Sequence, residues 1–160
     1  MLGYNTMHSP LSTSDIEQIY TITNSGAFGE CDTAINEGCQ NCCELGTVLF
    51  PGELEFLREQ QERGLISTRI EIRKRIKDCF DLRNLICLMD DLKPIACRLF
   101  PEISVYPHAG LIVADPNETC LARKTQTYAD SEFLRKANQV KKILGELLPF
   151  RSQIQGVTFL

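Results

Sequence analysis

Eight cysteines carry most of the chemistry that this sequence could support. Three of them, Cys39, Cys42 and Cys43, fall within five positions of the segment NEGCQNCCELG. A C-x-x-C spacing lets two sulfur atoms converge on one metal ion from a single turn of chain. We therefore expect a metal-binding cysteine cluster, and its candidate ligands are Cys31, Cys39, Cys42, Cys43, Cys79, Cys87, Cys97 and Cys120.

Two other interpretations of the cysteines stay open. Disulfide frameworks are typical of small secreted domains, and an even number of cysteines permits them. Adjacent Cys42 and Cys43, however, could pair with each other only through a strained geometry. Buried thiols can also serve as small apolar side chains. A chain of 160 residues needs no covalent cross-links to form a core, so metal ligation is the interpretation that we carry forward.

The ligand chemistry favours zinc, with iron or an iron–sulfur cluster as the alternative. Thiolates are soft ligands that suit these metals and not Mg²⁺ or Ca²⁺. Zinc takes four ligands in a tetrahedron, so eight cysteines could supply two closed sites or a bridged pair of ions. An iron–sulfur cluster also takes four cysteines, although the regular three-cysteine spacing of bacterial ferredoxins is absent here.

A cation is needed beside such a site, because a zinc ion with four thiolates carries a net charge of about −2. Arg98 directly follows Cys97 in the sequence. We therefore expect the Arg98 guanidinium to donate hydrogen bonds to the thiolates or to the carbonyls around them. The alternative is that Arg98 is a solvated arginine on the surface.

The sequence resembles a known family in two segments. One is CQNCC, with its adjacent pair at Cys42 and Cys43, and the other is KPIACRLFP, from Lys93 to Pro101. In the CxxCxxCC cysteine-cluster proteins, also called YkgJ-like, such a pair is usual. So is a Lys-Pro or Arg-Pro shortly before Cys-Arg, an aromatic residue and proline. The resembling stretch covers a little over half of the chain.

The resemblance implies chelation of zinc or iron, which is how the family is described, more firmly than it implies any reaction. Cys120 falls where the family tends to place a late cysteine. One departure concerns the first cysteine. In the family it usually lies two or three residues before the next, whereas seven residues separate Cys31 from Cys39 here.

Composition indicates one ordinary domain that spans residues 1–160. Hydrophobic residues make up 43% of the chain and charged residues 24%. The net charge of −4 argues against a nucleic-acid partner. The sequence shows no apolar run of the ~20 residues that span a membrane and no signal-peptide pattern at its start. We expect a cytoplasmic protein whose partners are metal ions, without nucleic acid or membrane.

The helices that must position these cysteines are predicted from capping residues and apolar periodicity. The first is expected at about 15–23, where Ser14 and Glu17 have the spacing of a capping box. The second is expected within 51–64, between a proline and a glycine. The third and clearest is expected at 128–148, where apolar residues recur with the period of a helix.

Strands and loops complete a small single α+β domain with short strands, a few helices and irregular loops that carry the cysteines. Alternation of Ile70, Ile72 and Ile76 predicts a strand, and ISVYPHAGLIVA at 103–114 predicts a hairpin around its PHAG turn. Residues 24–46 hold four glycines and four cysteines and are expected to form a loop.

Three classes of function fit this cluster. The chain could bind, store or deliver metal, it could be an enzyme that uses an iron–sulfur cluster or a thiolate, or it could be an interaction module with structural zinc. A closed site of four cysteines is structural, whereas a catalytic site keeps an open position. Whether the protein is an enzyme stays open at this point, since the sequence contains no phosphate-binding loop, nucleophile elbow or zinc-protease motif.

Overall fold

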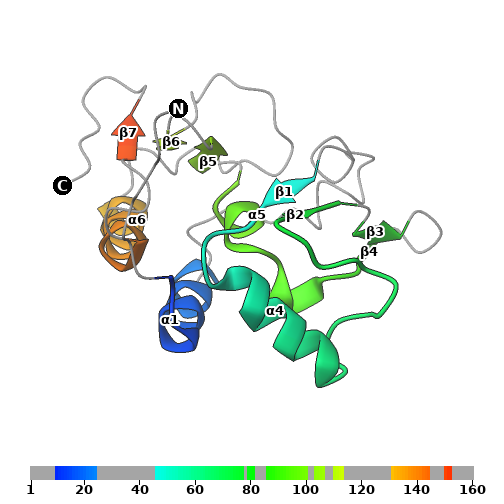
Figure 1. Cartoon of the computed structure of the whole chain (residues 1–160). Helices are drawn as coiled ribbons and strands as arrows, with labels where there is room; N and C mark the ends of the chain where they lie inside the picture. The colour runs from blue at the N-terminus through cyan, green and yellow to red at the C-terminus, as the bar shows by residue number, and fades with distance from the viewer. Residues whose placement is uncertain are drawn as a thin grey trace, which may run out of the picture.

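The computed structural model of this chain describes residues 10–24, 46–77, 79–81, 86–100, 103–106, 110–113, 131–144 and 150–152. These residues form helices and small sheets in mixed order, so the expected α+β class is confirmed (Figure 1). None of the helices in this described part combines the length and the apolar character that a bilayer crossing demands.

Helix α1 spans Thr13–Thr23 and begins with a capping box. The Ser12 hydroxyl accepts a hydrogen bond from the backbone N–H of Asp15 at 3.1 Å, and the Asp15 carboxylate accepts one from the N–H of Ser12 at 3.0 Å. The predicted capping box at Ser14 and Glu17 is therefore wrong. Ser12 has the extended backbone of an N-cap, whereas Ser14 already lies inside the helix.

Helix α4 spans Glu53–Glu62, inside the predicted range. Its N-cap is Gly52, whose φ of 94° lies in the left-handed region. A Cβ at this position would lie 2.2 Å from the carbonyl oxygen of Leu11, so only glycine fits. The N–H of Leu11 also donates to the carbonyl of Pro51 at 2.9 Å. The start of α4 is thereby held against the chain that leads into α1.

The burial pattern of the predicted strand at 70–76 is confirmed. Its regular pairing with another strand is confirmed only at its C-terminal end. Ile70, Ile72 and Ile76 are all buried. The regular strand β2 covers only Arg75–Ile76, and it pairs antiparallel with β1, which covers Thr47–Val48. Ile70 and Ile72 are buried in the core although they lie outside this strand. Alternation of apolar residues therefore predicted burial better than it predicted strand pairing.

Two further strands and two short helical segments link β2 to the larger sheet. Strands β3, Phe80–Asp81, and β4, Ile86–Cys87, pair antiparallel. The 3-10 helix η1 covers Asp90–Leu92, and helix α5 covers Ile95–Leu99. The sequence showed only a short apolar run in this region. A helix of five residues is too short to display a period.

The predicted hairpin is confirmed as strands β5, Ile103–Tyr106, and β6, Gly110–Val113, which pair antiparallel. Its PHAG turn at 107–110 lies outside the described residues except for its glycine. A third strand, β7, covers Phe150–Ser152 and pairs parallel to β6. This pairing was not predicted, because it joins segments about 40 positions apart with no local signal.

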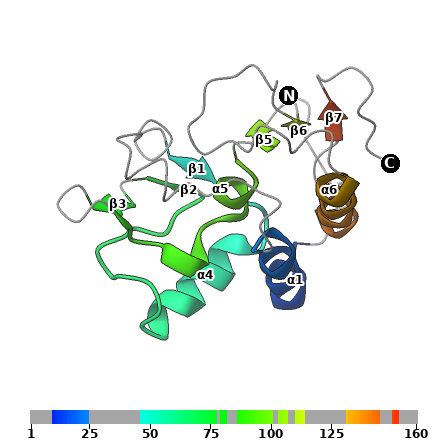
Figure 2. The same cartoon turned by 180° about the vertical axis from the view of Figure 1, so that it is seen from behind.

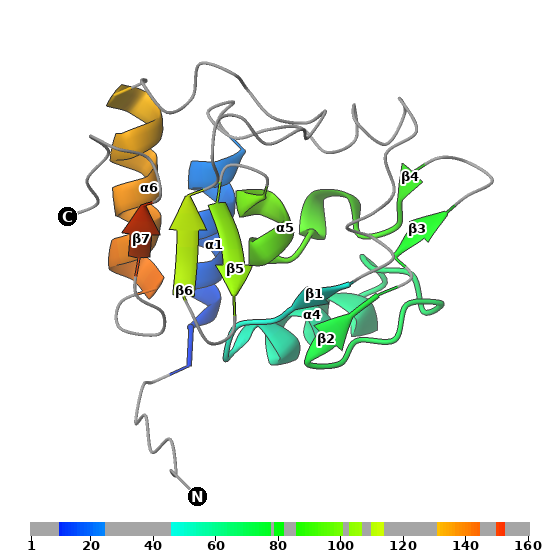
Figure 3. The ribbon, with the colours of Figure 1, turned by 90° about the horizontal axis from the view of Figure 1, so that it is seen from above.

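Helix α6 spans Ser131–Leu144 and confirms the clearest sequence prediction. Phe133, Ala137, Val140 and Leu144 are buried with the spacing that the apolar stripe required. The predicted ends of this helix, at 128–130 and 145–148, lie outside the described residues. Helix α6 packs against α1, and the two lie side by side beneath the β5–β6–β7 sheet (Figures 2 and 3).

One apolar core joins the described elements. Its fully buried side chains come from helices, strands and connecting segments. They include Ile16, Ile19, Leu57, Ile76, Met89, Ile95, Leu99, Ile103, Phe133 and Leu144. Helix α5 lies at the centre of this arrangement, since it packs against α1, β1 and β5. The helix that carries Cys97 is therefore positioned by α1 and β1, from distant parts of the sequence, and by the strand β5 that follows it.

Candidate metal centre and the buried polar cluster beside Cys97

Three of the eight candidate ligands lie in the described part of the chain: Cys79, Cys87 and Cys97. Within that part no disulfide joins these cysteines, and no group of three or more His, Cys, Asp or Glu side chains could hold a metal ion. The predictions for the other ligands lie outside the described residues, at Cys31, Cys39, Cys42, Cys43 and Cys120.

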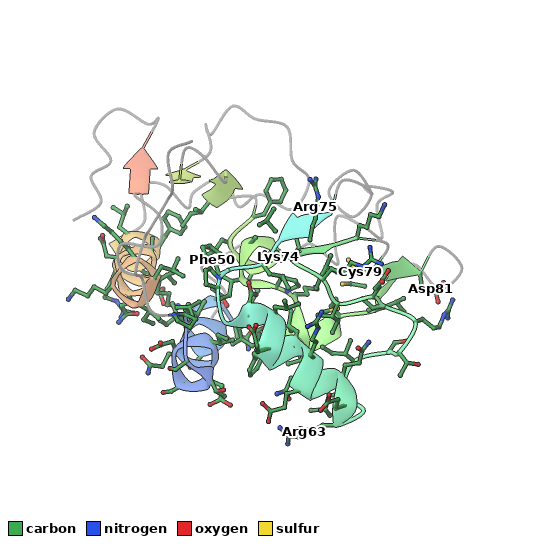
Figure 4. The ribbon with its side chains drawn as sticks, in the orientation of Figure 1. Phe50, Arg63, Lys74, Arg75, Cys79 and Asp81 are labelled. Atoms are coloured by element: carbon green, nitrogen blue, oxygen red, sulfur yellow. The ribbon has the colours of Figure 1, made fainter. Side chains whose placement is uncertain are left out.

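Cys79 directly precedes β3, and Cys87 lies in β4, the strand that pairs with β3. Figure 4 labels Cys79 beside this pair of strands. The backbone N–H of Leu88 donates to the carbonyl of Cys79 at 2.7 Å, and Cys87 pairs with Phe80 in the ladder. Cys79 is 5% exposed, and Cys87 is partly buried against the same apolar core. Burial of this kind fits both a closed thiolate site and inert packing thiols.

Strand β1 is the place where segments that carry cysteines come together. It follows Gly46, whose φ is +78°. A Cβ on Gly46 would lie 2.7 Å from the carbonyl oxygen of Ile76 and 3.0 Å from Cβ of Lys77. The backbone that follows the CQNCC segment is thus pressed against the chain just before Cys79. Because α5 also packs against β1, Cys97 belongs to the same neighbourhood of the fold.

Helix α5, which carries Cys97, has no cap within its own segment. Pro94 stands at the N-cap position and has no side-chain oxygen to accept a hydrogen bond. The first N–H of the helix, from Ile95, donates instead to Oε2 of Glu53 at 2.7 Å. The Glu53 carboxyl of α4 therefore caps the start of α5, although the two residues are 42 positions apart in the sequence.

Glu53 is fully buried, with 0% of its surface exposed. Its other oxygen, Oε1, accepts a hydrogen bond from the N–H of Phe50 at 2.9 Å. Burial raises the pKa of Glu53 to about 7, because desolvation outweighs the two backbone hydrogen bonds and the nearby charge of Arg98, which lower it. A carboxyl that titrates near neutrality thus joins the start of α4 to the start of α5.

Arg98 is buried at 9% exposure, so the alternative of a solvated surface arginine is wrong. Its Nε donates to the carbonyl of Lys93 at 2.9 Å, and Nη1 donates to Oδ1 of Asn24 at 2.6 Å. Nη2 donates to the carbonyl of Asp91. The carbonyl contacts were among those expected for Arg98. Donation to a thiolate, the other expected contact, stays a prediction.

Tyr20 from α1 completes this cluster. The Arg98 guanidinium carbon lies 3.7 Å from the centre of the Tyr20 ring, which is a cation–π contact. The Tyr20 hydroxyl is buried and has no partner in hydrogen-bonding geometry among the described residues. Burial raises the pKa of Tyr20, the charge of Glu53 adds to this, and Arg98 opposes it. A buried hydroxyl without a partner costs about 1–3 kcal/mol, so it marks a position that a further polar group would satisfy.

Sequence reasoning did not find Glu53, Tyr20 and Asn24 as neighbours of Arg98. Glu53 reads locally as an acidic residue in the first turn of a helix, and Tyr20 reads as part of an apolar helical face. Asn24 lies 74 positions from Arg98. No local signal marks these contacts, because the tertiary fold alone brings the three residues to α5.

An open groove of about 560 Å³ lies between α1 and α6, and its lining includes Glu17, Thr21, Gln139 and Lys142. None of the residues that line it is a cysteine. The groove is therefore not lined by the described cysteines Cys79, Cys87 and Cys97.

Comparison of the chain with protein-family models, curated proteins and solved structures finds no match. The resemblance to the CxxCxxCC proteins accordingly stays a prediction that rests on the two quoted motifs.

Proposed function

We propose that this chain is a metal-binding protein that chelates zinc, or alternatively iron, through its cysteines. The observation that carries the proposal is the meeting of three chain segments at β1. Gly46, three residues after CQNCC, lies against Ile76 and Lys77, and α5 with Cys97 packs on β1, which follows Gly46. Cysteines from distant parts of the sequence are thus attached to adjacent parts of the fold.

Covalent connectivity limits how far apart the first two cysteine groups can be. Since a residue spans at most ~3.5 Å, the Cα of Cys43 lies within ~10 Å of that of Gly46. By the same limit, the Cα of Cys79 lies within ~7 Å of that of Lys77. Two groups that start at a shared point of backbone contact are well placed to supply ligands to one ion.

The donor chemistry also fits a thiophilic metal. Thiolates favour zinc and iron over hard cations. When bound, such a metal would contribute free energy of folding to the loops that hold it. No disulfide joins the three described cysteines, Cys79, Cys87 and Cys97. Cysteines outside disulfides are typical of a reducing compartment, so the proposed location is the cytoplasm.

A structural role for zinc within an interaction module is the second candidate. The strands β1, β2, β3 and β4 each contain only two residues, so hydrogen-bonded ladders supply little order around Cys79 and Cys87. A closed zinc site would supply order of this kind. An iron–sulfur or thiolate-dependent enzyme is the remaining alternative, and the experiment below separates it by colour.

The test is metal analysis and a visible spectrum of protein purified without oxygen. We expect one or two thiolate-bound ions per chain. A colourless, zinc-rich protein supports metal binding or structural zinc, whereas a brown protein supports the iron–sulfur alternative. Eight freely titratable thiols with no metal would overturn the proposal.

Cysteine variants then test the ligands. The double variant Cys42→Ser with Cys97→Ser should lose most of the metal, because it removes a donor from each of two segments. Cys31→Ser is the matched comparison and should lose the least, since its spacing departs from the family pattern. Full retention of metal in the double variant would contradict the ligand assignment.

A further inference from the structure

Helix α5 depends on other segments for its position. It contains five residues, and isolated helices of this length are unstable in water. Pro94 at its N-cap offers neither a side-chain acceptor nor a backbone N–H. The N–H groups of its first turn therefore need an acceptor from elsewhere in the fold. That acceptor decides where Cys97, two residues further along, is held.

Glu53 supplies this acceptor with both oxygens engaged. Oε2 accepts from the N–H of Ile95 at 2.7 Å, and Oε1 accepts from the N–H of Phe50 at 2.9 Å. Glu53 also donates its own N–H to the carbonyl of Phe50 at 3.0 Å, so its backbone and side chain are both fixed to the turn before α4. Because none of the Glu53 surface is exposed, its side chain cannot rotate into solvent.

The ionisation of Glu53 bears directly on this geometry. Two N–H donors, one on each oxygen, match an ionised carboxylate. When the carboxyl takes up a proton, one oxygen carries an O–H beside a backbone N–H, and one of the two hydrogen bonds weakens. The charged or titratable groups that face Glu53 are Arg98 from α5 and Tyr20 from α1.

We propose that Glu53 is a positioning residue that fixes the start of α5, and thereby Cys97, and that this tether weakens when Glu53 binds a proton. The part that concerns Cys97 rests on the proposed metal-binding function. The part that concerns α5 stands on the two hydrogen bonds alone. Glu53 does not ligate metal in this proposal, and it acts only through the backbone of Ile95.

The first test follows the amide protons of Phe50 and Ile95 by NMR during a pH titration of the full chain. Both resonances should shift together with a single midpoint close to neutrality, since burial brings the pKa of Glu53 to about 7. Glu53→Gln should abolish this shared titration and speed the hydrogen exchange of one of the two amides about tenfold, the equivalent of one lost hydrogen bond. Glu55→Gln is the matched control, because Glu55 is an exposed acid in the first turn of the same helix.

The second test measures transfer of zinc to a competing chelator at fixed pH. Glu53→Gln should surrender zinc about 10–100-fold more readily than the parent, and Glu55→Gln should behave like the parent. If the parent binds no metal, the proposed function fails while the amide titration still decides the role of Glu53. If Glu53→Gln does not fold, the titration of the parent still decides it. The inference would be overturned if the amide resonances of Phe50 and Ile95 did not shift with pH, or if they shifted equally in Glu53→Gln.

Discussion

Helices α5 and α6 both pack against α1, but they are held in place by different means. Helix α6 buries four apolar side chains at helical spacing along 14 residues. Helix α5 has five residues; it also buries Ile95 and Leu99, but polar contacts with distant segments add to this packing. Glu53 accepts from its first N–H, and Arg98 on the helix reaches Asn24 beyond the end of α1.

This difference teaches where local sequence suffices and where it does not. The apolar period of an amphipathic helix determines which of its faces packs against the core. The orientation of a short helix such as α5 also depends on polar contacts, and its partners lie 42 and 74 positions away in the sequence. The candidate metal centre depends on the second kind of helix. Its geometry is therefore sensitive to residues that do not bind metal.

The largest expected effect concerns α6. Phe133 is fully buried, so Phe133→Ala should lower the free energy of unfolding by about 3–5 kcal/mol through lost burial and a cavity. The measurement is denaturant unfolding followed by circular dichroism. Gln139→Ala on the exposed face of the same helix is the control and should change stability by less than about 0.5 kcal/mol. Equal losses in the two variants would mean that α6 is not held by its apolar face.

The second effect is a pH dependence that arises from Glu53. Burial raises its pKa from 4.5 to about 7, because the desolvation that protonation relieves outweighs the hydrogen bonding that protonation weakens, so folding favours the protonated carboxyl. Its stabilising contribution is present below pH 4.5 and is lost as the pH rises through about 7. Relative to Glu53→Gln, the parent should lose about 3 kcal/mol of unfolding free energy across this range. Denaturant unfolding at several pH values measures the difference, and parallel pH curves for the two proteins would refute it.

The smallest effect concerns Arg98. Arg98→Ala removes three hydrogen bonds and the contact with the Tyr20 ring, and should lower the free energy of unfolding by about 2 kcal/mol. Arg98→Lys should restore only part of this, since an ammonium keeps the charge without the planar fork. Metal should also pass to a chelator at lower concentration in Arg98→Ala. Unchanged stability and unchanged metal transfer together would show that the cluster around Arg98 does not position α5.

The sequence was sufficient for much of the fold and for little of the candidate site. The helix at α6 and the hairpin of β5 and β6 follow from period and alternation, which are local signals. The burial of Ile70, Ile72 and Ile76 also followed from alternation. The parallel pairing of β7 with β6 did not, because nothing near Phe150–Ser152 indicates its partner.

For the candidate site, the sequence identified cysteines and Arg98 as residues of interest but not what holds them. Arg98 was placed near Cys97 by adjacency alone, and its burial over Tyr20 depends on the packing of α5 against α1. Glu53 has the same local appearance as Glu55, yet one is buried and the other exposed. The start of α5 reaches Glu53 through the N–H of Ile95, whereas Glu55 is exposed.

The packing of α1 against both α5 and α6 has a consequence during synthesis of the chain. Helix α1 is made before both partners, which follow roughly 70 and 110 residues later, about 4 to 20 seconds at ordinary rates of translation. Until then α1 lacks the two helices against which it packs, although Phe56 of α4 can already contact Tyr20. Of the described helices α1, α5 and α6, helix α1 is thus the one whose apolar face waits longest for its partners during synthesis.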